Sequence, residues 1–585
     1  MGEFGFIRVG AAVSAVKVAD CGFNVQKILE LLYRAVDQKT QIVAFPELSV
    51  TAYTCGDLFF QKTLIDESTN AVMSLLQSSR ELPICFIIGA PVCHNSKLYN
   101  CAIVCSRGEI LGIVPKEFLP NYSEFYEQRW FQSYRSDNLP TNILYSGANV
   151  PFGKNILFDF GNGKFAVEIC EDVWTVIPPS SYHAQAGASL LFNISASNEL
   201  IGKRRYIKSL LAQQSARCHA AYIYSSAGFG ESTTDVVYTG NAFIYENGNL
   251  LSESERFLID DQLVVCDVDV ELLNSERRKN TSFAGNSVEG LSERYFNVEI
   301  NLGVDLAESK LLRVVNPAPF IPLANNYDES CSEIFSIQVL GLAKRFIHTG
   351  VKSLILGVSG GLDSTLALLV CVKMADKLGL SRRVVCGVTM PGFGTSKRTY
   401  NNAIRLMDSL GIEVRDISIV AACNQHFKDI SHDPSLCDTT YENVQARERT
   451  QILMDLSNQM NGIVVGTGDM SELALGWATY NGDQMSMYGV NAGVPKTLVR
   501  YLVRWVQENC VEEVAGETLR DILDTPVSPE LLPKDSDGGM TQFTEDLIGF
   551  YELHDFFLFY VLRYGFSPRK IYFLAVNAFC GVYDG

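Results

Sequence analysis

From residue 331 onward, apolar runs of strand length alternate strictly with amphipathic runs of helix length. The pattern predicts helices and strands in turn, at 331–347, 353–358, 364–379, 382–390, 396–411, 413–419, 442–460 and 462–468. Parallel strands need a crossover of this size between them, whereas antiparallel strands can follow one another through tight turns. The alternation therefore predicts a doubly wound parallel sheet, with ligands bound beyond the carboxyl ends of its strands.

The first 270 residues also mix short apolar runs with stretches of helical periodicity. The apolar runs are typical of buried strands, at 42–45, 84–90, 110–114, 165–169, 189–194 and 220–227. The chain becomes charged and polar from about residue 275, and three prolines within 316–326 exclude a continuous helix there. We therefore predict a mixed α/β domain at 1–275, a linker at 276–325 and a second domain at 326–585.

Composition excludes several classes of protein. The 585 residues carry 48 basic and 66 acidic side chains, and a net charge of −18 opposes sequence-independent binding to nucleic acid or to an anionic membrane. No apolar stretch approaches the length that spans a bilayer, and Lys17 interrupts the apolar start, which we interpret as a strand. The 16 cysteines form no CxxC pair, so we expect reduced thiols, a cytoplasmic location and no zinc site.

Just past three predicted strands of the first domain, the chain carries a carboxylate, an ammonium and a thiol: Glu47, Lys116 and Cys170. If these strand ends converge, Glu47 can accept the thiol proton, and Lys116 can offset the acids that flank Cys170 and stabilise a developing oxyanion. The alternative is structural, because a cysteine at a strand end is often an inert core thiol and Pro-Glu or Pro-Lys often begins a loop.

The segments that hold these residues, IVAFPELSVTAY, LGIVPKEFLPNYSEFYEQRWF and FAVEICEDVW, resemble the Glu-Lys-Cys signatures of the nitrilase (carbon–nitrogen hydrolase) superfamily. The resemblance covers residues 1–270 and implies an αββα sandwich that hydrolyses an amide through a cysteine thioester. Its glutaminase branch implies catalysis by the three residues above and glutamine contacts at Tyr53, Tyr122, Ser197 and Lys203. Related glutaminases often carry arginine at the last position, and a lysine offers one point charge in place of a fork.

In the second domain, the stretch LILGVSGGLDSTLALLV (354–370) combines a buried strand, a glycine loop and a helix. Its glycines allow backbone N–H groups to close around an anion, and the helix N-terminus adds positive charge. Asp363 would repel a phosphate unless a metal bridged the two, which favours Mg²⁺. The alternative is a purely structural turn between strand and helix.

The hexapeptide SGGLDS resembles the pyrophosphate loop of the ATP pyrophosphatases, and ENVQARERTQ, VVGTGDMSELALGWATYNGD and VNAGVPKTLVRYL resemble the NAD synthetases among them. The resemblance implies an adenine nucleotide α-hydrolase-like fold with Mg²⁺ held by Asp363 and Glu472. It implies ATP contacts at Gly357, Val358, Ser359, Gly360, Gly361, Leu362, Asp363, Ser364, Thr467 and Lys496. It implies contacts with deamido-NAD at Asn443, Arg447, Glu472, Trp477, Ala478, Thr479, Tyr480 and Asp483.

The two halves together are similar to the family of glutamine-dependent NAD synthetases. That resemblance implies that the second domain adenylates the carboxylate of deamido-NAD, and that ammonia from the first domain reaches the adenylate through a water-excluding passage. It also implies a homo-oligomer, an octamer in many members. Three alternatives stay open: an amidotransferase for another substrate, a nitrilase fused to a redundant ATP domain, and a catalytically silent nucleotide-binding assembly protein.

Two features near the carboxyl end bear on the dinucleotide site. Residues 531–549 resemble the mobile loop that covers the nucleotides in the family, although their polarity fits any surface loop. Family members continue beyond the position of Gly585 with a basic tail whose lysine reaches deamido-NAD. Whether the dinucleotide site is complete without such a lysine stays open.

Overall fold

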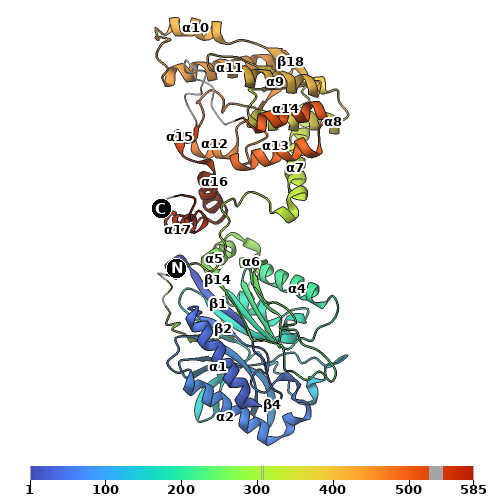
Figure 1. Cartoon of the computed structure of the whole chain (residues 1–585), viewed down its shortest axis with the longest axis vertical. Coiled ribbons are helices and arrows are strands. Elements are labelled where there is room, and N and C mark those ends of the chain that lie inside the picture. Colours follow the sequence, from blue (N-terminus) through green and yellow to red (C-terminus); the bar gives the residue numbers. More distant parts are fainter. Residues whose placement is uncertain (1, 287, 305, 307–308, 526–543, 584–585) are drawn as a thin grey trace. The chain divides into compact units, whose positions relative to one another are not determined.

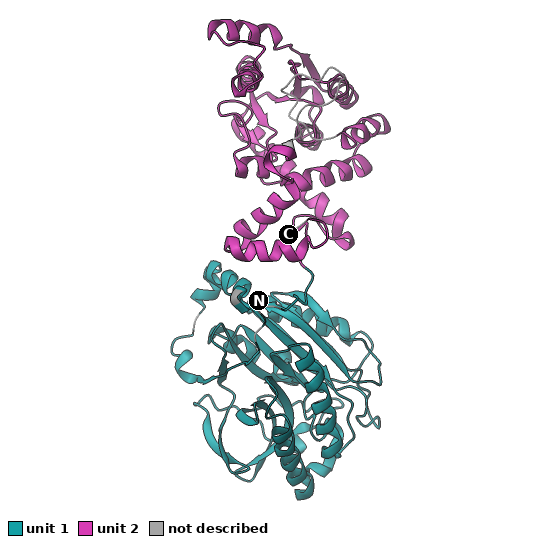
Figure 2. Ribbon diagram, turned by 60° about the vertical axis from the view of Figure 1, so that its left-hand side comes forward, with its two compact units in different colours: residues 1–314 teal, residues 315–585 magenta. Residues whose placement is uncertain are grey.

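The computed structural model describes residues 2–286, 288–304, 306, 309–525 and 544–583. These residues form two compact units, 1–314 and 315–585 (Figure 2). Most of the segment predicted as a linker belongs to the first unit, and it contributes a paired strand at Phe296–Glu299. No helix among the described residues combines the length and the apolarity that a bilayer crossing requires.

Two mixed sheets form the centre of the first unit. One has eight strands, in the order β14 (Gln262–Asp269), β1 (Phe6–Val13), β2 (Ile42–Ala44), β3 (Cys85–His94), β4 (Lys97–Ser106), β5 (Glu109–Pro115), β7 (Ala148–Phe152) and β6 (Thr141–Tyr145). The other has seven, in the order β13 (Asn249–Glu253), β12 (Ala242–Glu246), β11 (Ala221–Ser226), β10 (Leu190–Ser195), β9 (Lys164–Ile169), β8 (Ile156–Asp159) and β15 (Phe296–Glu299). Apolar side chains from both sheets share one buried cluster, so the sheets pack face to face.

Helices cover the outer faces of both sheets, as Figure 1 shows for α1 and α2. The helices of this unit are α1 (Cys21–Asp37), α2 (Lys62–Ser78), α3 (Pro179–Gln185), α4 (Lys203–Arg217), α5 (Val270–Lys279) and α6 (Thr281–Gly285). Helix α1 buries Ile28, Leu31 and Leu32 against the eight-stranded sheet, as its period of apolar residues requires. The predicted αββα sandwich is confirmed.

A five-stranded parallel sheet forms the centre of the second unit, in the order β18 (Glu413–Asp416), β17 (Val385–Thr389), β16 (Ser353–Gly357), β19 (Gly462–Gly466) and β20 (Tyr488–Gly489). Its helices are α7 (Tyr327–Thr349), α8 (Leu362–Lys377), α9 (Lys397–Leu410), α10 (Val420–Asp429), α11 (Thr439–Gln459), α12 (Met470–Leu475), α13 (Lys496–Asn509), α14 (Glu513–Leu523), α15 (Thr544–Ile548), α16 (Tyr551–Phe559) and α17 (Pro568–Ala578). Separate apolar clusters line the two faces of the sheet, which confirms the doubly wound fold.

Part of the predicted nucleotide-covering loop lies outside the described residues, at 531–543, and its last residues form α15. Predicted element bounds otherwise differ by a few residues. The strand predicted at 413–419 ends at Asp416. Ile417 N donates to the carbonyl of Thr389, the last residue of β17, and Ile419 N donates to that of Pro391, beyond β17, in a loop that leads to α10. Backbone hydrogen bonds, rather than apolar character, thus set where this strand stops.

Candidate active sites

The three residues predicted at strand ends are all buried: Glu47 is 0%, Lys116 is 1% and Cys170 is 5% exposed. Glu47 follows β2 and Lys116 follows β5 in one sheet, whereas Cys170 follows β9 in the other. The loop at Glu47 crosses β3 at Gly89, where a Cβ atom would lie 2.1 Å from the backbone nitrogen of Leu48. Only glycine allows this close approach, so the crossing depends on the absence of a side chain.

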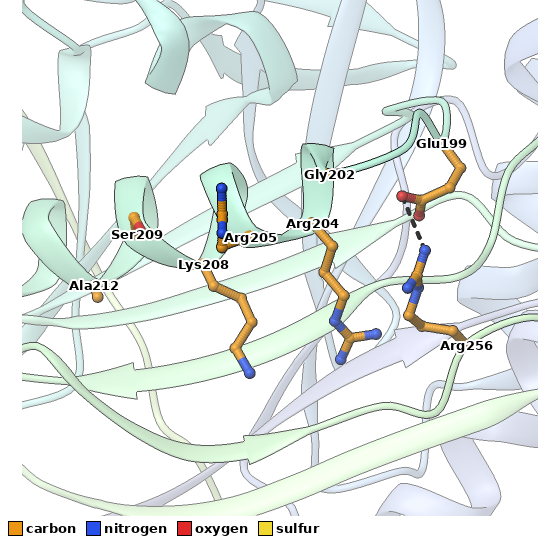
Figure 3. A pocket seen from close by; sticks show the side chains of 8 residues that line it. All are labelled: Glu199, Gly202, Arg204, Arg205, Lys208, Ser209, Ala212 and Arg256. Carbon is orange, nitrogen blue, oxygen red and sulfur yellow. Dashed lines mark ion pairs between the residues drawn. The ribbon is translucent and has the colours of Figure 1, made fainter. Parts of the chain in front are cut away.

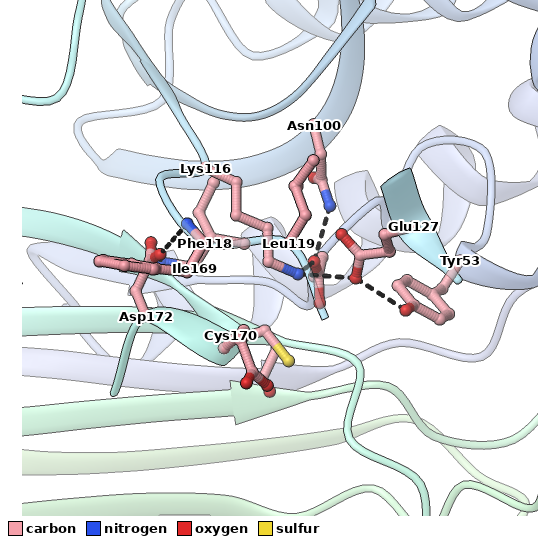
Figure 4. A network of polar contacts seen from close by, with 12 residues as sticks. Tyr53, Asn100, Lys116, Phe118, Leu119, Glu127, Ile169, Cys170 and Asp172 are labelled. Atoms are coloured by element: carbon pink, nitrogen blue, oxygen red, sulfur yellow. Dashed lines mark hydrogen bonds and ion pairs between the residues drawn. The ribbon is translucent and has the colours of Figure 1, made fainter. Parts of the chain in front are cut away.

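A network of short polar contacts joins these groups (Figure 4). Lys116 Nζ donates to Glu47 Oε1 at 2.6 Å and to Glu127 Oε1 at 2.7 Å. Asn100 also donates to Glu47 Oε1, and the Tyr53 hydroxyl donates to Glu127, both at 2.7 Å. Glu47 Oε2 is buried and has no hydrogen-bond partner among the described residues. One oxygen of Glu47 is therefore held by cation and amide while the other is free to accept a proton.

Cys170 sits at the junction of β9 and a short 3₁₀ turn, with φ at +43°. This left-handed conformation is unusual for a residue with a side chain and is held by neighbours such as Asn193, whose Oδ1 accepts from Cys170 N at 3.2 Å. Figure 4 shows Cys170 beside the polar network that Lys116 and Glu127 form. Burial and the charge of Glu47 raise the pKa of the Cys170 thiol, and Lys116 opposes that rise. The thiol is therefore protonated at rest.

Glu127 was not singled out from the sequence, although it lies within the quoted segment around Lys116. Burial raises the pKa of Glu127 to about 7, and the Lys116 ammonium opposes the rise. Burial lowers the pKa of Lys116, but the charges of Glu127 and Glu47 outweigh it and hold that pKa well above the usual range. The centre therefore contains one ammonium shared by two carboxylates, beside a neutral thiol.

The predicted glutamine contacts surround this centre. The Tyr122 hydroxyl donates to both Glu171 oxygens at 3.0 and 3.1 Å, and Lys203 Nζ donates to Asn198 Oδ1 at 2.7 Å. Ser197 N donates to Ser226 Oγ at 3.1 Å, at the end of β10. Tyr53 lies against Glu127, to which its hydroxyl donates.

Lys203 has an environment of its own. Its ammonium lies 5.5 Å from the ring centre of Trp174 and 5.7 Å from that of Phe125. Burial lowers the pKa of Lys203, and the charges around it, with Cys170 first among them, oppose that change. A half-buried cation thus stands within electrostatic reach of the thiol, next to aromatic faces that exclude water.

In the second unit, residues 357–361 connect β16 to α8 in a tight glycine loop. Gly360 has φ at +84°, and a Cβ atom there would lie 2.3 Å from the carbonyl oxygen of Thr399, so glycine is required. Ser359 Oγ accepts from Gly361 N at 3.2 Å, and Ser364 Oγ accepts from Ser359 N at 3.3 Å. The loop and the first turn of α8 are thus held together by two serine hydroxyls.

Three carboxylates and one ammonium meet beyond the ends of β16 and β19. Lys496 Nζ lies 2.7 Å from Asp363 Oδ2, 2.8 Å from Asp469 Oδ2 and 2.8 Å from Glu472 Oε1. The three acids place ligand atoms within 4.8 Å of one another, which is a spacing that can hold a metal ion. Asp469 was not singled out from the sequence, although it precedes Glu472 by three residues and caps the same helix, α12.

These charges depend on one another. Burial raises the pKa of Glu472 to about 7 and also raises that of Asp469, and Lys496 opposes both changes. Burial lowers the pKa of Lys496, but the carboxylates outweigh it and hold that pKa well above the usual range. Buried Asn491 donates to the carbonyl oxygens of Asp363 and Thr467, at 2.9 and 3.0 Å, and so ties the first turn of α8 to the loop after β19.

The remaining candidates lie on α11 and in the loop after α12. The structure brings them together in pairs: Asn443 Oδ1 accepts from Thr479 Oγ1 at 2.8 Å, and Arg447 Nε donates to the Tyr480 carbonyl at 3.1 Å. Asp483 closes the loop by accepting from Thr479 N at 2.7 Å. Two residues that flank Ala478 in the sequence have exposed rings, since Trp477 is 37% and Tyr480 is 72% exposed.

A surface pocket of about 630 Å³ lies on α4, and none of the predicted site residues lines it (Figure 3). Four cationic side chains line it: Arg204, Arg205, Lys208 and Arg256. Glu253 pairs with Arg204 at 2.6 Å and with Lys208 at 3.0 Å, and Glu199 pairs with Arg256 at 3.0 Å. Because three of its four cations are already paired with carboxylates, we assign the pocket no function.

Comparison with known families agrees with this division of the chain. Residues 9–278 match the model of the carbon-nitrogen hydrolase family, and residues 334–548 match the model of the NAD synthase family. The two matches contain the sites of the first and second units, respectively. The predicted fusion of these two families is confirmed.

Relatives match the chain over nearly its whole length. A glutamine-dependent NAD(+) synthetase of Mycobacterium bovis is 42% identical over 98% of this chain and 86% of its own. One from Mycobacterium leprae is 41% identical over 98% of this chain and 86% of its own, and one from Thermotoga maritima is 28% identical over 97% and 90%. At this identity and coverage, the chain belongs to the family of glutamine-dependent NAD(+) synthetases.

Proposed function

We propose that this chain converts deamido-NAD to NAD⁺, with glutamine as the nitrogen donor and with cleavage of ATP to AMP and pyrophosphate. The observation that carries the proposal is the arrangement of a strained, buried Cys170 beside an ammonium shared by Glu47 and Glu127. The glycine loop and the acidic cluster of the second unit complete the chemistry that an amidating ligase needs.

In the first unit, Glu47 Oε2 would take the proton of Cys170 as the sulfur attacks the amide carbon of glutamine. The Lys116 ammonium would stabilise the negative oxygen that forms, since it is buried and cannot be screened by water. Glu47 would then return the proton to the leaving nitrogen, which departs as ammonia. Water would hydrolyse the remaining thioester to glutamate and restore the thiol.

Glutamine recognition would use Tyr122, Ser197 and Lys203, with Tyr53 holding Glu127 in place. Removing the cation in Lys203→Ala should raise the KM for glutamine about 10–100-fold, the range expected for a hydrogen bond to a charged group. Synthesis with ammonium should not change, because it does not use this pocket. Lys208→Ala, one turn further along α4 and paired with Glu253, is the matched control. An unchanged KM in Lys203→Ala would contradict this role.

The charge of Glu127 should give glutamine hydrolysis a pH dependence. With a pKa of about 7, this carboxylate is charged above neutrality and becomes neutral as the pH falls through 7. A neutral Glu127 holds Lys116 less well, so kcat/KM for glutamine should fall on the acid side of pH 7. Glu127→Gln should have a low kcat/KM for glutamine at every pH and should not show this decrease below pH 7. Glu117→Gln, which replaces a carboxylate that pairs with Lys154, should still show the decrease. If Glu127→Gln still showed the decrease below pH 7, a group other than Glu127 would be responsible for it.

In the second unit, ATP would bind at residues 357–364, with Thr467 and Lys496 as further contacts. The glycine loop presents backbone N–H groups at the start of α8, where the helix dipole favours phosphate. The carboxylate of deamido-NAD would attack the α-phosphorus and release pyrophosphate. Ammonia would then attack the resulting acyl-adenylate and release AMP, leaving the amide of NAD⁺.

The acidic cluster fits Mg²⁺. All three of its groups are carboxylates, the ligand type that Mg²⁺ prefers, and Asp363 Oδ1 is buried with no hydrogen-bond partner among the described residues. Asp363 and Glu472 would hold the ion, and Asp469 would be a third ligand. Bound Mg²⁺ would neutralise phosphate charge. Lys496, which now balances the three acids, would then be free to pair with the phosphates of ATP.

Deamido-NAD would lie across α11 and the loop at 476–483. Asn443 and Arg447 of α11 contact Thr479 and Tyr480 of this loop, so both surfaces of the proposed site are held together. The exposed rings of Trp477 and Tyr480 offer faces on which a base or a nicotinate ring can stack. Glu472, Ala478 and Asp483 would complete the contacts.

One assay tests the proposal against its alternatives. The chain is incubated with ATP, Mg²⁺ and deamido-NAD, with glutamine or ammonium as donor, and NAD⁺, AMP and glutamate are quantified. We expect NAD⁺ and AMP in equal amounts with either donor, and glutamate with glutamine alone. Glutamate release without NAD⁺ would favour another amidotransferase. Amide hydrolysis that does not depend on ATP would favour the nitrilase fusion. Formation of neither glutamate nor NAD⁺ would favour a silent assembly protein.

We further propose a cytoplasmic homo-oligomer. All 16 cysteines are free, which suits a reducing compartment. Several large apolar side chains of the first unit are exposed, among them Val176 at 96%, Ile177 at 56% and Tyr206 at 59%. Apolar groups gathered on a protein surface commonly mark contacts between subunits.

A further inference from the structure

The carboxylate of Asp172 joins the loops that carry two of the proposed catalytic residues. It lies in the 3₁₀ turn at Cys170–Trp174, and its side chain is buried, at 2% exposure. Asp172 Oδ2 accepts from Ile169 N at 2.9 Å, and Oδ1 accepts from Phe118 N at 2.8 Å (Figure 4). Ile169 directly precedes Cys170, and Phe118 follows Lys116 by two residues, so one carboxylate bridges two strand ends from different sheets.

This bridge acts where the backbone is under strain. Cys170 is in the left-handed conformation, which is retained only where surrounding contacts determine it. Asp172 follows Cys170 by two residues, and its side chain accepts a hydrogen bond from the backbone N–H of Ile169, the residue before Cys170. This bond closes the turn that holds the sulfur. Burial raises the pKa of Asp172 well above its usual range, and the bonds from Ile169 N and Phe118 N oppose this rise. A buried carboxylate is costly in free energy, and this one is held by two backbone donors.

We propose that Asp172 is a positioning residue for glutamine hydrolysis, which sets the placement of the Cys170 sulfur relative to the Lys116 ammonium. The inference rests on the proposed function, because it assumes that these two groups act on glutamine. Asp172 bonds to backbone groups, whereas the proposed glutamine contacts are Tyr122, Ser197 and Lys203. Its loss should therefore slow the chemical step more than it weakens glutamine binding.

The test uses the full chain and two variants. Asp172→Asn keeps one acceptor oxygen but turns an amide nitrogen toward a backbone N–H, and Asp172→Ala removes both acceptors. We expect kcat for glutamine to fall about 100-fold in Asp172→Asn, the scale of a misplacement of about 1 Å. It should fall further in Asp172→Ala, with KM within about threefold of wild type in both.

Thiol reactivity provides a readout that a merely structural role would not change. Alkylation of Cys170 by iodoacetamide, followed by mass spectrometry of its peptide, should shift to higher pH in both variants, because Lys116 then stabilises the thiolate less well. Synthesis with ammonium should stay within about twofold of wild type, since the second unit has its own core.

Glu168→Gln is the matched control. Glu168 is also a buried carboxylate close to Cys170 in sequence, but it accepts from Ser180 N at 2.7 Å and from the Tyr222 hydroxyl, not from the Lys116 loop. Its kcat for glutamine should stay within about threefold of wild type.

Three results would overturn the role of Asp172: a kcat within threefold of wild type in Asp172→Asn, an equal loss in Glu168→Gln, or a parallel loss of synthesis with ammonium. A wild-type chain that releases no glutamate from glutamine would instead refute the proposed function itself.

Discussion

Cys170→Ala should abolish NAD⁺ formation from glutamine, by at least roughly 10⁴-fold, because it removes the sulfur on which the proposed thioester forms. Synthesis with added ammonium should remain near the wild-type rate, since the proposed adenylating site lies in the second unit, which has its own hydrophobic core. The measurement is NAD⁺ formation with each donor in turn, together with glutamate release. In Cys170→Ala, a rate of NAD⁺ formation that is far higher with ammonium than with glutamine is the expected sign of separate sites.

Cys85→Ala is the matched control for this experiment. Cys85 lies on β3, is fully buried in the core between the two sheets, and has a thiol pKa raised by burial, yet it is not part of the polar network. Its loss should leave glutamine use unchanged. Two results would contradict the assignment: glutamine use that survives in Cys170→Ala, or a loss of ammonium use as deep as that of glutamine use.

Asp363→Ala should abolish synthesis with both donors, by at least about 10³-fold, because it removes a proposed ligand of Mg²⁺ at the glycine loop and leaves phosphate charge uncompensated. Hydrolysis of glutamine to glutamate should persist, since Glu47, Lys116 and Cys170 are intact. Formation of AMP and pyrophosphate gives the direct measurement. The Mg²⁺ concentration that supports any residual activity should rise.

The control for this change is Asp376→Ala on the same helix, α8. Asp376 pairs with Arg382 at 2.7 Å on the surface, so its loss changes the charge by the same amount without touching the loop. Thermal unfolding of Asp363→Ala should show that the unit stays folded. If synthesis continued at the wild-type rate in Asp363→Ala, the metal role of this residue would be wrong.

Much of the second unit could be predicted from local patterning. Helices and strands leave different apolar periods, and an alternating order forces parallel pairing through helical crossovers. The first unit was harder to predict from the sequence. Its sheets include antiparallel strands such as β6 and β7, whose short apolar runs give only weak evidence of a strand. Strand β15 comes from the polar segment predicted as a linker, and its pairing with β8 could not be inferred from composition.

The residues of the candidate sites also fall into those that the sequence revealed and those that it did not. Glu47, Lys116 and Cys170 were found because each follows a buried strand, and Asp363 because it follows a glycine loop. Glu127 gave no such signal, since it lies in an irregular loop where an exposed glutamate would be ordinary. Asp469 and Asp172 were likewise hidden, because their sequence positions also suit a helix cap and a surface turn. The catalytic and binding roles stay predictions until they are measured.

Local patterns in the amino-acid sequence were enough to place many of the strands and helices, the sharp turns and the reactive groups at strand ends. These follow from side-chain periodicity and from glycine, which act over a few neighbouring residues. The three-dimensional fold was needed to show which charges share a partner: Lys116 between two glutamates, Lys496 among three acids, and Asp172 across two loops. Burial decides this, because a charge removed from water must find its partner in space, wherever that partner lies along the chain.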